Sequence, residues 1–118
     1  MTIFVSESSK DIMEGLSKME TAMIEDYNQF MPENTEVQTK MRQEFVDNFE
    51  VTFGNKYIKV LEKNAGVRAF IVNTDKDKKF KMGDILKPAG RAAPARNKAR
   101  GNILDGGYAI DWTGPMYL

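Results

Sequence analysis

The chain contains no cysteine and no histidine among its 118 residues. The absence of cysteine excludes disulfide bonds and thiolate metal sites. The absence of histidine removes the usual general base at neutral pH and the commonest metal ligand. The sequence also has no phosphate-binding loop, dinucleotide-binding fingerprint or nucleophile elbow. We therefore expect a protein that is not an enzyme, with no catalytic residues, no metal site and no cofactor.

Long hydrophobic runs are also missing. No apolar segment approaches the roughly 18 residues that a membrane-spanning helix needs. The apolar start at residues 1–5 has no basic segment before it and runs directly into the polar residues 6–9, which is not the pattern of a signal peptide. We expect a single domain covering residues 1–118, located in the cytoplasm and not bound to a membrane.

The formal net charge of zero hides an uneven distribution of charge. Residues 1–50 carry eleven acids and four bases, which gives a formal charge of −7. Residues 51–118 carry thirteen bases and six acids, which gives +7. Such opposed fields either steer different partners and draw copies of the chain into a homo-oligomer, or neutralise each other within the fold.

Residues 1–48 are predicted to form an acidic helical hairpin. Apolar residues recur at helical steps of three and four in the first helix, at Ile12, Leu16, Met19, Met23, Tyr27 and Phe30. Ser8 or Ser9 is the expected N-cap, and Pro32 should end this helix near Phe30. Thr35, followed three residues later by Gln38, predicts the start of a second helix.

Residues 49–118 form the basic part of the chain and show strand patterns. Apolar and polar residues alternate at 49–53, and the segments 57–63 and 67–73 are further strand candidates. Shorter strands are expected within 80–86 and 108–112. The sequence thus predicts an α+β fold, with two N-terminal helices packed on an antiparallel β-meander or a small open β-barrel.

A charged turn is expected at residues 74–79. Asp75 and Asp77 resemble the opening of a calcium-binding loop, which requires a glutamate at its twelfth position. That position is occupied by Leu86. We therefore interpret the segment as a solvated turn between two strands.

Residues 87–102 form a basic loop. The segment has five basic residues, no acid, two prolines and two glycines, and it lacks bulky apolar side chains. A continuous helix is excluded by this composition, which is typical of a loop offered to an anionic partner. The candidate nucleic-acid contacts are Arg91, Arg96, Lys98 and Arg100 in the loop, with Lys79 and Lys81 at its margin.

Two aromatic residues after the loop are candidate stacking platforms for bases, namely Tyr108 and Trp112. The alternative is that these aromatic rings belong to the core. The arginines have an alternative role as well. Arg96 or Arg100 would then pair with Asp84, Asp105 or Asp111 and pin the loop to the sheet, and the acidic helices would be the working surface.

Three segments of the chain carry a resemblance to a known family. They read FKMGDILKPA from Phe80, APARNKARGNI from Ala93 and DWTG from Asp111. As a set they resemble a family of small uncharacterised proteins from tailed bacteriophages, and the resemblance covers residues 56–114. It implies a viral origin and no known activity.

These observations together favour a non-catalytic phage accessory protein that binds nucleic-acid phosphates through its basic loop in the host cytoplasm. One alternative is a modulator or inhibitor of a host protein that acts through the acidic helices. The other alternative is a small virion or assembly component.

Overall fold

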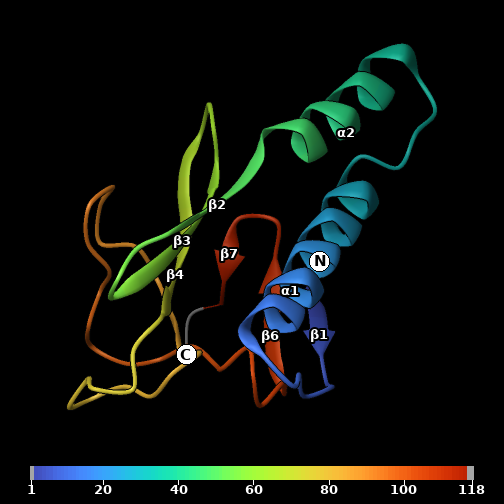
Figure 1. The fold of residues 1–118 in the computed structure, drawn as a ribbon. Coiled ribbons are helices and arrows are strands. Elements are labelled where there is room, and N and C mark those ends of the chain that lie inside the picture. Colours follow the sequence, from blue (N-terminus) through green and yellow to red (C-terminus); the bar gives the residue numbers. More distant parts are fainter. Residues whose placement is uncertain (1, 117–118) are drawn as a thin grey trace.

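The computed structural model describes residues 2–116, which form two helices and seven short strands (Figure 1). The helices are α1 (Ile12–Phe30) and α2 (Glu36–Asn48). The strands are β1 (Ile3–Val5), β2 (Phe49–Phe53), β3 (Tyr57–Glu62), β4 (Gly66–Val72), β5 (Ile85–Leu86), β6 (Tyr108–Asp111) and β7 (Gly114–Pro115).

Both helices begin at a side-chain cap. The carboxylate of Asp11 accepts a hydrogen bond from the backbone N–H of Glu14 at 2.9 Å, so Asp11 is the N-cap of α1. The prediction of a serine cap was wrong, because the helix begins only at Ile12. The hydroxyl of Thr35 caps α2 by accepting from the N–H of Gln38 at 3.1 Å, as predicted.

The strands form two antiparallel sheets. One is the predicted meander, with strand order β2-β3-β4-β5, and it does not close into a barrel. The other has the order β1-β6-β7 and joins the beginning of the described chain to its end. The α+β fold class is confirmed, whereas the second sheet was not predicted. A strand of three residues is too short for its alternation to be recognised.

The core lies between α1 and the two sheets. Met19 and Met23 of α1 are fully buried, in one cluster with Ile58 of β3, Ile71 of β4 and Ile110 of β6. Helix α2 contributes a single buried residue, Phe45, and extends away from the sheets (Figure 1). The molecule is therefore elongated, with a longest dimension of 48 Å.

The basic loop at residues 87–102 returns along β5 and is held by backbone hydrogen bonds. The N–H of Ile85 donates to the carbonyl of Gly101 at 2.8 Å, and the N–H of Arg100 donates to the carbonyl of Ile85 at 2.7 Å. Within the loop, the N–H of Ala95 donates to the carbonyl of Lys87 at 2.7 Å. The loop lies on the side of the meander opposite the helices (Figure 1), so this basic loop is separated in space from the acidic helices.

Candidate anion-binding site

Asp77 is the centre of the turn that follows β4. Its Oδ1 accepts hydrogen bonds from the backbone N–H groups of Lys79 at 2.8 Å and Phe80 at 3.0 Å. The side chain is 2% exposed. Aspartate forms such contacts with amides two and three residues ahead, and this contact stabilises the turn without a regular strand.

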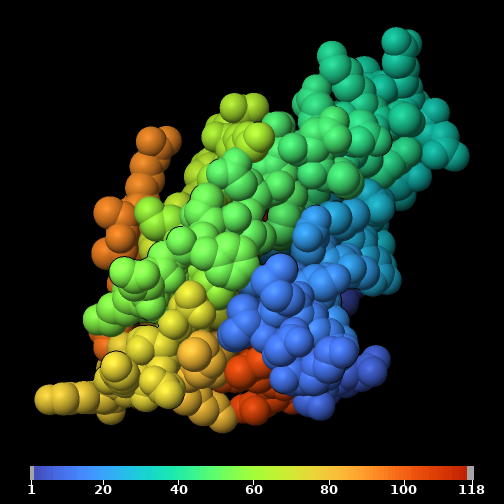
Figure 2. Space-filling view, viewed as in Figure 1, coloured from blue at the N-terminus to red at the C-terminus, as the bar shows by residue number. Residues whose placement is uncertain are grey.

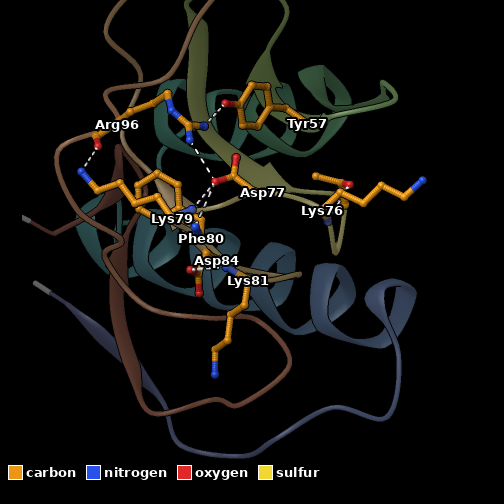
Figure 3. Close-up of polar contacts among 9 residues, drawn as sticks. Tyr57, Lys76, Asp77, Lys79, Phe80, Lys81, Asp84 and Arg96 are labelled. Carbon is orange, nitrogen blue, oxygen red and sulfur yellow. Dashed lines mark hydrogen bonds and ion pairs between the residues drawn. The ribbon is translucent and has the colours of Figure 1, made fainter.

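Arg96 reaches this carboxylate from the basic loop (Figure 3). Its Nη2 donates to Asp77 Oδ1 at 3.0 Å, its Nη1 donates to the hydroxyl of Tyr57, and its guanidinium lies 5.0 Å from the centre of the Phe80 ring. The hydrogen bond from Arg96 holds the pKa of Asp77 well below its usual range, and the same bond raises the pKa of Arg96. Lys79 adds a second tie, because its Nζ donates to the carbonyl of Arg96 at 2.6 Å.

These contacts clamp the loop to the turn, which is the alternative role expected for a loop arginine. The predicted partners for Arg96 were wrong, since Asp77 takes the place of Asp84, Asp105 or Asp111. Asp84 instead accepts from the side-chain amide of Asn102 at 2.9 Å. Asp105 pairs with Lys81 at 2.5 Å and raises the pKa of that lysine.

A pocket of about 500 Å³ lies beside this clamp. Its lining includes Thr74, Asp77 and the four cationic residues Lys56, Lys76, Lys78 and Arg96. Lys76 and Lys78 are exposed and form no ion pair within residues 2–116, and Lys76 extends away from the Asp77 cluster (Figure 3). Because the one carboxylate is already engaged by Arg96, the pocket presents unneutralised positive charge to solvent.

The remaining sequence candidates fall into two groups. Arg91 and Lys98 are exposed on the loop, as expected for contacts with an anion. Arg100 and Tyr108 are 6% and 3% exposed, so neither side chain is accessible to a nucleic acid at the surface. Burial raises the pKa of the Tyr108 hydroxyl to about 12. The stacking interpretation of Tyr108 is therefore wrong, and its ring belongs to the core.

Trp112 belongs to an aromatic cluster beneath α2. Its ring meets that of Tyr27 edge-on with centroids 5.3 Å apart, and it lies close to Phe45. The guanidinium of Arg68 lies 5.5 Å from the centre of the indole ring. Trp112 thus packs between the helices and the sheet and takes no part in the pocket at Asp77.

The sequence did not reveal that Asp77 and Lys56 form one site with Lys76 and Lys78 of the charged turn. The turn at 74–79 looked like a solvated connection, and Lys56 lies in a different hairpin. The available signal was the aspartate two residues before Lys79, since an aspartate at that spacing often caps a turn. Its proximity to Arg96 depends on the path of the loop and is not visible in the local sequence.

Replacing Asp77 with asparagine should loosen the loop. The new side chain would keep an oxygen for the two backbone N–H groups but would lose the charge that holds Arg96. We expect the amide of Ala95 to exchange with solvent several-fold faster in Asp77→Asn than in the parent protein, measured by NMR. Asp75→Asn is the matched control, because Asp75 is exposed in the same turn. Equal exchange in both variants would contradict the clamp.

Other classes of site find no support in the described part of the chain. No group of three or more acidic residues within 2–116 is placed to hold a metal ion. None of the helices in this range is both long enough and apolar enough to cross a bilayer. The structure defines an α+β protein with a basic pocket beside the Asp77 clamp.

The chain belongs to a family of unknown function (DUF7717), whose model matches residues 3–118. The match includes both helices and both sheets, whereas the resemblance seen in the sequence covered only residues 56–114. No curated protein and no solved structure matches the chain.

Proposed function

We propose that this protein binds nucleic acid through its phosphates, at the basic surface formed by the turn at residues 74–81 and the loop at residues 87–102. The observation that carries the proposal is the pocket at Asp77, which is lined by Lys56, Lys76 and Lys78 in addition to the paired Arg96 and Asp77. Phosphate contacts supply most of the affinity of non-specific nucleic-acid binding, and they require cations that are not neutralised within the protein.

The roles of the cations differ in this proposal. Lys76 and Lys78 contact phosphate oxygens, together with Arg91 on the loop. Arg96 and Lys79 position the loop, because their polar groups are already engaged with Asp77, Tyr57 and a backbone carbonyl. Binding of this kind tracks the phosphate backbone and has little dependence on base sequence, since the aromatic rings first considered for stacking lie elsewhere.

The viral origin implied by the resemblance gives this activity a setting. The protein would be a non-catalytic phage accessory protein that acts on nucleic acid in the host cytoplasm. The separation of the basic loop from the acidic helices supports phosphate binding, because the acidic face does not lie beside the phosphates (Figure 1).

The proposal predicts steeply salt-dependent binding. A mobility shift on short single- and double-stranded DNA and RNA should be strong at about 50 mM salt and weak at about 200 mM salt. Lys76→Ala/Lys78→Ala should bind more weakly on every sequence. Its slope of log affinity against log salt should be shallower by about two units, because two fewer counterions are released.

Lys10→Ala/Lys40→Ala is the matched control, since it removes the same charge from exposed sites in the acidic half. This variant should bind like the parent protein. An equal loss in both double variants would place the contact elsewhere, and no shift at the lower salt would disprove the proposal. The loop arginines Arg96 and Arg100 are unsuitable for this test, because one holds the clamp and the other is buried.

A second candidate function uses the helices. Phe30, Val37 and Val46 are large apolar side chains that are 54%, 67% and 41% exposed on the acidic helical part. Apolar residues surrounded by acids suit a basic, partly apolar groove on a host protein. Retention of a host protein by the parent and by Lys76→Ala/Lys78→Ala, with loss in Phe30→Ala/Val37→Ala, would favour this function. A virion or assembly component would instead appear in purified particles.

A further inference from the structure

Strand β2 forms an open edge of the meander. Its strand partner is β3, and no strand within residues 2–116 pairs with its other side. The green segment that contains β2 lies uncovered at the surface beside the blue of α1 (Figure 2). An open edge carries unpaired backbone groups and is a template for pairing with another chain.

The direction of these backbone groups follows from two hydrogen bonds at the ends of the hairpin. The N–H of Gly54 donates to the carbonyl of Tyr57 at 2.9 Å, and the N–H of Lys63 donates to the carbonyl of Asn48 at 3.0 Å. Bonded and non-bonded pairs alternate in an antiparallel ladder, so the even-numbered residues of β2 bond to β3. The N–H and C=O groups of Val51 and Phe53 therefore point outward.

Phe49 offers only an acceptor at this edge. Its N–H already donates to the carbonyl of Val46 at the end of α2, while its C=O lies on the same side as those of Val51 and Phe53. The open edge thus presents two donors and three acceptors in a row.

The edge has little of the usual protection against pairing. Strand β2 contains no lysine, no proline and no bulge, and its one charged residue, Glu50, is paired with Lys63. Large apolar side chains lie next to it instead, with Phe53 55% exposed and Met13 of α1 64% exposed. Both residues line a groove of about 220 Å³ between α1 and β2. The surface therefore combines open backbone groups with an apolar border.

We propose that β2 of a second copy of this chain pairs with this edge in an antiparallel register, across a two-fold axis at Val51. The two copies then share one continuous sheet. This register places each Val51 opposite the other and each Phe49 opposite the second copy's Phe53. The two Val51 residues exchange both backbone bonds, and each Phe53 N–H donates to the second copy's Phe49 carbonyl, which gives four hydrogen bonds.

The side chains of β2 are complementary to themselves in this register. Glu50 is opposite Thr52, so no carboxylate faces another, and Glu50 keeps its own ion pair with Lys63 at 3.7 Å. Phe49 and Phe53 form two aromatic cross-strand pairs on the face that carries α1. A two-fold axis at Glu50 would oppose two carboxylates and would use the backbone groups that already bond to β3. Both the charges and the backbone therefore favour the axis at Val51.

The proposed dimer is independent of nucleic-acid binding and differs from an association between the acidic and basic halves. It uses neither the basic loop nor the acidic face of the helices. Because the two proposals use different surfaces, a result that contradicts one does not contradict the other. The dimer would also carry two basic pockets.

The test is the association of the full chain, measured by sedimentation velocity from micromolar to millimolar concentration. We expect a monomer–dimer equilibrium. Thr52→Glu should raise the dimer dissociation constant about tenfold, because it creates two symmetric Glu–Glu pairs at the interface. The fold should tolerate this change, since Thr52 is exposed and lies opposite Lys59 of β3. Thr39→Glu adds the same charge at an exposed site on α2 and should leave the equilibrium unchanged.

Hydrogen exchange by NMR gives a residue-level readout. The amides of Val51 and Phe53 should become protected as the concentration rises, and the amide of Phe49 should not change. A monomer at all concentrations with fast exchange at Val51 would overturn the proposal. A dimer that withstands Thr52→Glu, or that is lost in Lys76→Ala/Lys78→Ala, would also overturn it in favour of another interface.

Discussion

Replacing Glu62 with glutamine should raise the free energy of unfolding by about 1–2 kcal/mol at about pH 8, because water in the cleft screens part of the cost of the charge, and should change it little at about pH 4. Glu62 ends β3 and is 6% exposed in the cleft between α2 and the sheet. Its Oε1 has no hydrogen-bond partner in the described part of the chain. Burial raises the pKa of this carboxyl from 4.5 to about 7, although the nearby Arg68 acts in the opposite direction.

The sign of the pH dependence follows from which state holds the proton. Below about pH 4.5 the carboxyl is protonated in both the folded and the unfolded chain, and Glu62 costs nothing. Between that pH and about 7 the folded protein keeps a proton that the unfolded chain releases, so stability falls as the pH rises. Above this window the buried charge is fully present. Glutamine resembles the protonated acid and stays neutral at every pH, so the variant does not lose this stability as the pH rises.

Urea unfolding of the parent and the variant at the two pH values measures the effect. Glu44→Gln is the control, because Glu44 lines the same cleft but is exposed. We expect this control to follow the parent protein at both pH values. Equal stability of Glu62→Gln and the parent at about pH 8 would show that the cleft is hydrated well enough to accept the charge.

The features that were predictable from the sequence are those with a long regular pattern. Helix α1 repeats its apolar stripe over 19 residues, and the three long strands of the meander each carry apolar residues that favour a sheet. The cap at Thr35 and the end of α1 before Pro32 were predictable because they depend on neighbouring residues. Such local signals need no knowledge of the tertiary structure.

The features that escaped prediction depend on contacts between distant segments. Strand β1 is recognisable only beside β6, more than 100 residues later. Arg96 and Arg100 each follow an alanine in the same basic segment. Arg100 is nevertheless buried, whereas Arg96 clamps the turn at Asp77. The backbone bonds from Ile85 to the end of the loop turn Arg100 inward. Composition alone could therefore identify the basic segment but could not separate its structural cations from its exposed ones.

Replacing Gly106 with alanine should destabilise the protein by about 3–4 kcal/mol, because it adds a clash to a strained backbone. Gly106 has a φ of +73°, which L-residues with a side chain rarely adopt. A Cβ at this position would lie 2.2 Å from the carbonyl oxygen of Glu7, and backbone cannot swing aside as a side chain can. The clash falls where the chain leaving β1 passes the turn before β6. Alanine would therefore push apart the two ends of the chain that form the second sheet.

The adjacent glycine separates the clash from the strain. Gly107 has a φ of +71°, nearly the same as Gly106, but a Cβ there would meet nothing within 4 Å. Gly107→Ala should therefore cost only about 1–2 kcal/mol, which is the backbone term alone. Urea unfolding of both variants measures the difference between their free energies of unfolding. The amides of β1 should stay protected from hydrogen exchange in Gly107→Ala and should lose this protection in Gly106→Ala. Equal destabilisation by the two substitutions would mean that β1 moves away at no cost, and that the second sheet contributes little to the stability of the fold.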